Sequence, residues 1–346
     1  MSGALAELAR TRLEAVERFL ESRGLTIDAV GEAVVGALGE PATILLTSSP
    51  VHGLANALSD IDTVCIVEGG EEVAGMATQL FAAGNHLEYV HFTRALLERD
   101  LDHLERVAAL APAAAVAAYH GWNTARTVRL KYLERIVNGI ATDGTMPFAD
   151  HLPDLATMWK WSSLERAIRL AALAIIAERA GESRGRLAYA ANSTLYAMDA
   201  VLCDRDSVCG NRKWFLLRWD RFCRTRHGGE PPVAAIETAR TALGRIPVEG
   251  AALAGTMVET VAELGQALGA PVGTLACAPP AGTRELALLP GGSMVVLSGG
   301  GAVPTADGSP APAEASLAEL AELDAAAAAA LLRRLRAEAL RLEVWP

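Results

Sequence analysis

Lysine is scarce in this chain: three occur among 346 residues, at Lys131, Lys160 and Lys213, and arginine supplies the other basic side chains. Acidic residues outnumber basic residues by 41 to 31, which gives a net charge of −10. A general nucleic-acid binder normally carries a basic face, so this charge balance disfavours DNA or RNA as the partner. An acidic chain suits a cationic small molecule better.

Long apolar runs and a cysteine framework are also missing. No apolar stretch reaches the roughly 18–20 residues of a membrane span, and residues 1–20 carry charges throughout, unlike a signal peptide. The five cysteines are odd in number and widely spaced, which predicts no disulfide framework. Cys203, Cys209 and Cys223 with His227 lack a Cys-x₂-Cys pair, which disfavours a structural zinc site. We therefore expect a cytoplasmic protein that does not associate with membranes.

The distribution of strand and helix patterns predicts an α+β fold. Hydrophobic residues make up 51% of the chain, enough to fill the cores of more than one domain. We expect a small mixed-sheet domain over residues 1–95, an all-helical domain over residues 96–271, and an appendage over residues 272–346. The appendage is expected to hold a hairpin around Gly291, a mobile loop over residues 299–315, and helices after it.

Within the first domain, short apolar runs alternate with amphipathic segments. Helical spacing of apolar residues predicts helices over residues 3–23, 26–38 and 71–83. Apolar and β-branched runs predict strands over residues 43–47, 60–67 and 86–92. These elements form a compact α/β unit around a small sheet.

Two aspartates and a glutamate on these strands are the strongest chemical signal. Asp60 and Asp62 are two residues apart, so both side chains point to the same face of their strand. Glu88 lies in the middle of the next predicted strand, where an acidic side chain is costly unless it is paired or metal-bound. If the two strands are neighbours, three carboxylates converge, and Mg²⁺ prefers such oxygen ligands.

The loop before Asp60 carries groups that can bind phosphate. Ser48 and Ser49 directly follow an apolar strand, and Gly53 and Ser59 lie in the loop. Their hydroxyl and backbone N–H groups could cradle phosphates. His52 in the same loop is either a phosphate contact or a solvated histidine.

The segment from Leu45 to Asp62 resembles the signature of the DNA polymerase β-type nucleotidyltransferase superfamily. That signature is a strand ending in Gly-Ser, a loop, Asp-x-Asp on the next strand and a third acidic residue on a later strand. Ser48-Ser49 take the Gly-Ser place, Asp60 and Asp62 match the metal-binding pair, and Glu88 matches the third carboxylate. The leading helices and the helical second domain resemble the aminoglycoside-type, small-molecule nucleotidyltransferases.

The resemblance implies a function and a set of site residues. A Mg²⁺-dependent enzyme would transfer a nucleoside monophosphate, AMP from ATP or the equivalent from another NTP, to a small-molecule acceptor and release pyrophosphate. Asp60, Asp62 and Glu88 would be catalytic and would bind the metal, and Ser48, Ser49 and Ser59 would bind the nucleotide. The acceptor is expected to be cationic, in antibiotic modification or secondary metabolism.

The segment Asn211-Arg212-Lys213-Trp214 resembles part of the helical domain of such enzymes, in which a lysine can contact the triphosphate. Lys213 is thus a candidate phosphate ligand, and the alternative is a residue on a solvated helix face. Asp199 is either a general base or acceptor ligand, or the partner of an arginine in its own domain.

Ser48 departs from the family pattern, which has glycine at this position. Glycine lets the backbone approach phosphates closely. The departure motivates an alternative function, a nucleotide-binding pseudoenzyme or interaction module without transfer activity. A protein-modifying member of a toxin–antitoxin pair is a third possibility, which the length of the chain disfavours.

Overall fold

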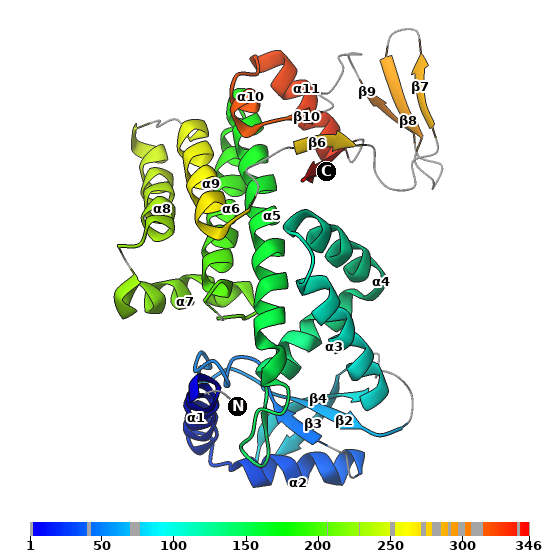
Figure 1. Ribbon diagram of the computed structural model, residues 1–346, viewed down its shortest axis with the longest axis vertical. Coiled ribbons are helices and arrows are strands. Elements are labelled where there is room, and N and C mark those ends of the chain that lie inside the picture. The colour runs from blue at the N-terminus through cyan, green and yellow to red at the C-terminus, as the bar shows by residue number, and fades with distance from the viewer. Residues whose placement is uncertain are drawn as a thin grey trace. The chain divides into compact units, whose positions relative to one another are not determined.

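The computed structural model (Figure 1) describes residues 3–39, 43–69, 77–205, 207–227, 229–249, 253–270, 275–278, 285–289, 292–296, 302–305, 314–337 and 340–345. The fold is mixed α+β, as predicted. Contacts divide the chain into two compact units. The first comprises Met1–Trp159 and Arg205–Trp214, and the second comprises Lys160–Asp204 and Phe215–Pro346. The first unit therefore takes in helices that follow the domain boundary predicted at residue 95.

The first unit is built on a mixed sheet. Its strands are β1 (Thr43–Leu46), β2 (Ile61–Val67), β3 (Thr78–Ala82), β4 (Asn85–Thr93) and β5 (Ile140–Ala141), in the order β3-β4-β2-β1-β5. The β2 and β4 strands are parallel, and the other neighbouring pairs are antiparallel. The helical elements are α1 (Gly3–Glu21), α2 (Ile27–Leu38), α3 (Arg94–Ala108), α4 (Pro112–Asn138), η1 (Ala149–His151), the start of α5 (Leu152–Arg179) and η2 (Arg212–Trp214).

The two faces of this sheet have different roles. Figure 1 shows α2 below the sheet, with α3 and α4 above it. Val16 of α1 and Val30 of α2 pack with Ile61 and Leu87 in one core cluster. Because side chains alternate along a strand, the residues next to Ile61 and Leu87 point to the opposite face. That opposite face, which α4 covers in part, carries the carboxylates of the candidate site.

Residues 71–83 do not form the predicted helix. The structure describes residues 78–82 as strand β3, which pairs with β4, and residues 70–76 lie outside the described part. Ala83 and Gly84 both have positive φ, 46° and 77°, and make the tight turn between the two strands. Such turns reverse the chain within two residues. The apolar residues here also have helical spacing, which is why the sequence predicted a helix.

The second unit is helical with small C-terminal sheets. Its helices are the rest of α5, α6 (Ser183–Cys203), α7 (Phe215–Phe222), η3 (Cys223–His227), α8 (Pro231–Glu249), α9 (Ala254–Leu268), α10 (Leu317–Ala321) and α11 (Ala325–Arg336). The strands are β6 (Leu275–Ala278), β7 (Glu285–Leu289), β8 (Gly292–Val296), β9 (Ala302–Thr305), β10 (Glu314–Ala315) and β11 (Arg341–Val344). The order is β10-β6-β11 in one sheet and β7-β8-β9 in the other.

The predicted C-terminal hairpin is confirmed, because β7 and β8 pair antiparallel, and residues 290–291 between them lie outside the described part. Residues 299–315, predicted to be a mobile loop, include the strands β9 and β10, and the other residues of that range lie outside the described part. Strand β11 was not predicted. It pairs with β6 some 65 residues earlier in the chain, a contact that local pattern does not encode.

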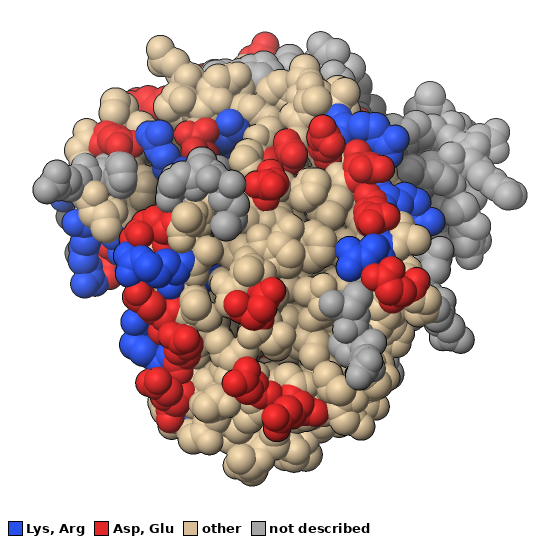
Figure 2. Space-filling view, turned by 60° about the horizontal axis from the view of Figure 1, so that its bottom comes forward, with Lys and Arg blue, Asp and Glu red and all other residues tan. Residues whose placement is uncertain are grey.

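Acidic and basic side chains are mixed on the face of the molecule that Figure 2 shows. Figure 2 shows Asp and Glu side chains interspersed with Lys and Arg, and the coloured residues on this face form no continuous basic patch. Among the described helices, none combines the length and the apolar run that crossing a bilayer requires.

The centre of the first sheet provides a test of the fold. Leu45 on β1 is fully buried and pairs with Val64 on β2 and with Ala141 on β5. Leu45→Ala should lower the free energy of unfolding of the first unit by about 2–5 kcal/mol, because it removes buried methyl groups and leaves a cavity. Urea denaturation followed by circular dichroism measures the change. Leu58→Ala is the control, since Leu58 is 92% exposed, and it should change stability by no more than about 0.5 kcal/mol.

Candidate functional site

The loop between β1 and β2 is held in place at many points. The backbone N–H and Oγ of Thr47 both donate to the carbonyl oxygen of Asp62, at 3.0 and 3.2 Å. Buried Val51 and Leu54 anchor the middle of the loop. Nη2 of Arg23 donates to the carbonyl oxygens of Asn56, Ala57 and Ser59, at 3.3, 3.0 and 2.6 Å. The loop is thus a fixed scaffold for its serines.

Ser48 begins this loop in an unusual backbone conformation. Its φ is 64°, in the left-handed region that glycine adopts without cost. The Oγ atom of Ser48 is buried and has no hydrogen-bond partner in the described part of the chain. A buried hydroxyl without a partner is available to a ligand.

Parallel pairing of β2 and β4 brings two of the three predicted carboxylates, Asp62 and Glu88, side by side. Asp62 is in register with Glu88, so the two side chains leave the same face of the sheet side by side. Asp60 lies two residues before Asp62, where β2 begins, and its side chain is 59% exposed. Nδ1 of His86 lies 3.4 Å from Oδ1 of Asp60, and Nε2 of Gln79 donates to Oε1 of Glu88 at 3.4 Å.

A basic residue that sequence reasoning missed lies against these carboxylates. Nη1 of Arg135, on α4, is 3.5 Å from Oδ1 of Asp62, and both side chains are largely buried, with 17% and 16% exposed. The arginine offsets the negative charge of Asp62. Nothing in the local sequence around Arg135 marks it, because the contact depends on how α4 crosses the sheet.

One pocket collects the predicted nucleotide and metal ligands. It has a volume of about 210 Å³ and is lined by Ser48, Ser49, Asn56, Leu58, Ser59, Asp60, Asp62, Arg135, Asn211 and Lys213. Every predicted site residue except Glu88 is in that lining. Lys213, on η2, comes from a segment about 150 residues after the loop, and its Nζ lies 5.0 Å from the ring centroid of Trp214.

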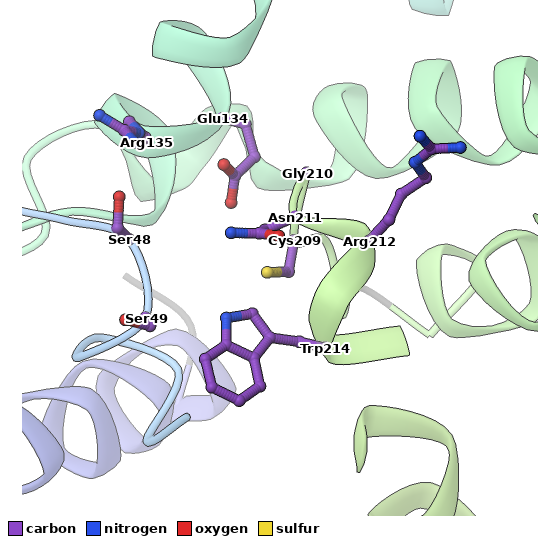
Figure 3. A pocket seen from close by; sticks show the side chains of 9 residues that line it. All are labelled: Ser48, Ser49, Glu134, Arg135, Cys209, Gly210, Asn211, Arg212 and Trp214. Atoms are coloured by element: carbon purple, nitrogen blue, oxygen red, sulfur yellow. The ribbon is translucent and has the colours of Figure 1, made fainter. Parts of the chain in front are cut away.

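A second, larger cavity adjoins the first. Its volume is about 440 Å³, and Figure 3 shows the lining residues, which are Ser48, Ser49, Glu134, Arg135, Cys209, Gly210, Asn211, Arg212 and Trp214. It shares Ser48, Ser49, Arg135 and Asn211 with the smaller pocket. Nε1 of Trp214 is buried and lacks a hydrogen-bond partner among the described residues. Two polar atoms at this cavity, on Ser48 and Trp214, are therefore available to a ligand.

Two other candidates turn out differently. Asp199 is buried in the second unit, where Arg218 Nη1 donates to Oδ1 at 2.8 Å and Ser163 Oγ donates to Oδ2 at 2.7 Å. Of the two roles that the sequence allowed for Asp199, the structure shows the ion pair with an arginine of its own domain. His52 is not a solvated loop residue: its side chain is 12% exposed, and Nε2 lies 3.3 Å from Oε1 of Glu134. Glu134 and Cys209, missed as site residues, lie beside it.

Comparisons with known proteins identify the family. A model described as "Family of unknown function (DUF6001)" matches residues 4–345, so the chain belongs to that family. No curated protein matches the chain. One solved structure, a nucleotidyltransferase-like protein from Exiguobacterium sibiricum 255-15, is 9% identical over 70% of this chain and 74% of that chain, with a TM-score of 0.28. A TM-score of that size does not establish a shared fold.

The positive φ of Ser48 leads to a prediction about thermal stability. Ser48→Gly should relieve a left-handed conformation that costs an L-residue roughly 1–2 kcal/mol, partly offset by the roughly 0.5–1 kcal/mol that glycine loses in chain entropy. We expect thermal melting of the variant at or above the wild-type temperature. Ser49→Gly is the matched control, because Ser49 does not have a positive φ, and it should melt lower. A lower melting temperature for Ser48→Gly than for Ser49→Gly would contradict the strain argument.

Proposed function

We propose that this member of the DUF6001 family is a nucleotidyltransferase that transfers a nucleoside monophosphate, AMP from ATP in the first instance, to a small-molecule acceptor. In this reaction an acceptor oxygen or nitrogen forms a bond to the α-phosphorus. The bond from that phosphorus to the α,β-bridging oxygen breaks, pyrophosphate leaves, and the acceptor loses its proton.

The smaller pocket is the observation that carries the proposal. Ser48, Ser49, Ser59, Asp60, Asp62 and Lys213 were each assigned to nucleotide or metal binding from the sequence, and all line the same pocket. The position of Lys213 is the strictest test of this assignment, since Lys213 comes from a distant segment of the chain. A pocket that joins hydroxyls, carboxylates and an ammonium group suits a metal-bound polyphosphate.

The carboxylates suit Mg²⁺ by their chemistry. Asp60, Asp62 and Glu88 offer only oxygen donors from one face of adjacent strands, and hard Mg²⁺ prefers oxygen. Arg135 and His86, which lie against Asp62 and Asp60, are the groups that offset this negative charge in the protein alone. When bound, Mg²⁺ would neutralise charge on the triphosphate and polarise the reacting phosphate.

The remaining lining residues would orient the triphosphate. The Oγ atom of Ser48, which has no partner in the described part of the chain, would donate to a phosphate oxygen. Lys213 would place a compact positive charge at the β- or γ-phosphate. The 440 Å³ cavity, which shares four lining residues with the smaller pocket, is where the acceptor would bind. Pockets of this size suit small molecules.

A second candidate function follows from Arg135. The arginine is paired with the aspartate that would hold the metal, as in a site where a fixed positive charge replaces the cation. A protein of that kind would bind a nucleotide without transferring it. The two functions differ in whether product forms, since both predict nucleotide binding through Lys213.

Nucleotide binding is tested with Lys213→Ala. Loss of one charge-assisted contact costs about 1.5–3 kcal/mol, so the variant should bind a non-hydrolysable ATP analogue with Mg²⁺ about 10–150-fold more weakly. Isothermal titration calorimetry measures the affinity. Arg106→Ala is the control, because Arg106 is exposed on α3 and lines neither pocket, and it should leave affinity unchanged. Equal affinities for wild type and Lys213→Ala would remove Lys213 from the site.

Transfer is tested with Asp62→Asn. In this variant, we expect pyrophosphate release and the formation of nucleotidylated product to fall to background. Mass spectrometry measures the product over a panel of cationic and neutral acceptors. Asp102→Asn, on an exposed position of α3, should keep wild-type turnover. Nucleotide binding by wild type with no product from any acceptor would favour the second candidate function. Wild-type turnover by Asp62→Asn would overturn the metal assignment.

A further inference from the structure

A second set of metal-binding side chains lies beside the proposed nucleotide pocket and differs from it in chemistry. Nε2 or Nδ1 of His52, a carboxylate oxygen of Glu134 and Sγ of Cys209 all lie within 4.8 Å of one another. The three residues come from the β1–β2 loop, from α4 and from the segment before η2. All three are largely buried, with side-chain exposures of 12% for His52 and 6% for Glu134, and 4% of the Cys209 residue exposed.

We propose that His52, Glu134 and Cys209 bind a Zn²⁺ ion, with a fourth coordination position open to the 440 Å³ cavity. The inference does not depend on the proposed nucleotidyltransferase function. Nitrogen, oxygen and thiolate sulfur together are the donor set of zinc, and Mg²⁺ does not favour thiolate. Zinc sites with three protein ligands keep the fourth position for water or a bound molecule.

The observed geometry is close to that of a zinc site. Two ligands at about 2.0–2.2 Å from a tetrahedral zinc ion are about 3.3 Å apart. Nε2 of His52 lies 3.3 Å from Oε1 of Glu134. Figure 3 shows the carboxylate of Glu134 and the sulfur of Cys209 directed toward the same space, next to the indole nitrogen of Trp214. The three ligand atoms all lie within 4.8 Å of one another, so a small movement of the side chains would complete the three-ligand arrangement.

Hydrogen bonds behind the cluster hold the carboxylate in place. Nδ2 of Asn138, which is fully buried, donates to Oε1 of Glu134 at 3.1 Å and to the carbonyl oxygen of Val208 at 3.2 Å. Oδ1 of Asn138 in turn accepts from Nη2 of Arg12 at 2.6 Å. Partners of this kind orient metal-binding carboxylates. Asn138 therefore fixes both Glu134 and the residue before Cys209.

The charges of the cluster balance without metal, and zinc would leave one positive charge in excess. Burial lowers the pKa of Arg12 to about 10, while the charges of Glu134 and Cys209 act to raise it, so the guanidinium stays protonated at neutral pH. Without metal, the Arg12 cation offsets the Glu134 carboxylate. Zinc binding would displace the thiol proton of Cys209, so that Zn²⁺ balances a thiolate and a carboxylate. The charge left on Arg12 would favour an anionic oxygen, hydroxide or a ligand carboxylate or phosphate, at the fourth position.

Zinc at this site would link two segments that line the nucleotide pocket. His52 lies in the loop that carries Ser48, Ser49 and Ser59, and Cys209 lies four residues before Lys213. A metal bridge between them would hold the phosphate-binding loop against the segment that carries the lysine. Bound zinc would also stabilise the folded first unit.

The test is metal content and cobalt spectroscopy of the full chain. After incubation with excess Zn²⁺ and desalting, inductively coupled plasma mass spectrometry should find about one zinc per chain. Co²⁺ in its place should give a thiolate-to-cobalt charge-transfer band in the near ultraviolet. Cys209→Ser should lose this band. Loss of a group that only hydrogen-bonds to a metal ligand weakens metal binding by about 10–100-fold. His52→Ala removes a ligand itself and should weaken zinc binding by more than that.

Two controls separate this site from other metal binding. Cys223→Ser changes a partly buried cysteine of the second unit and should keep both the zinc and the cobalt band. Asp62→Asn should keep zinc as well, whether or not the proposed transfer function is correct. Circular dichroism reports folding of each variant, and if Cys209→Ser does not fold, His52→Ala decides, since His52 lies in a loop.

Wild type without retained zinc and without the cobalt band would overturn the proposal. Equal zinc content in wild type and folded His52→Ala would do the same, because zinc would then bind elsewhere. A cobalt band that disappears in Cys223→Ser would move the thiolate ligand to the second unit and would also overturn it.

Discussion

The hydrogen bonds of the Asn138 side chain are the interactions on which the arrangement of both adjoining pockets depends. It is fully buried at the end of α4 and binds Arg12 of α1, Glu134 of its own helix and the backbone of Val208. Each of these buried polar groups would cost about 1–3 kcal/mol if left unsatisfied, so α1, α4 and the segment at Val208 are kept together. Through Val208 the network holds the segment up to Lys213 beside the β1–β2 loop.

The β1–β2 loop and the strand that follows it contribute to two donor sets with different chemistry. The carboxylates of Asp60, Asp62 and Glu88 offer only oxygen, which suits a hard cation. His52, Glu134 and Cys209 combine nitrogen, oxygen and sulfur, which suits a borderline-soft one. Arg135 lies against Asp62 and is adjacent in sequence to Glu134, so α4 contributes to both sets from successive residues.

The sequence was informative where the structure follows from local patterns, such as the alternation of side chains along a strand. The alternation of side chains along β2 predicted that Asp60 and Asp62 share a face, and the register of β2 with β4 places Glu88 beside Asp62 as expected. The pairing of β7 with β8 was predictable from two strand patterns that flank a pair of glycines in the sequence. Strand β3 was missed because its apolar residues also fit a helix, and the short turn at Ala83 and Gly84 gave the only contrary signal. Periodicity over so short a run does not separate the two structures.

By itself, the sequence determined the α+β class and the strands that carry the carboxylates, because these follow from side-chain alternation, and its resemblance to a known motif supplied the candidate residues of the smaller pocket. Only the tertiary structure decided which distant residues join them. Arg135 reaches Asp62, and His52 meets Glu134 and Cys209, across about 70 to 160 residues of chain. Such contacts depend on how α4 and the segment before η2 pack against the sheet. Packing of that kind is set by the burial of whole elements, and no local pattern around Arg135, Glu134 or Cys209 records it.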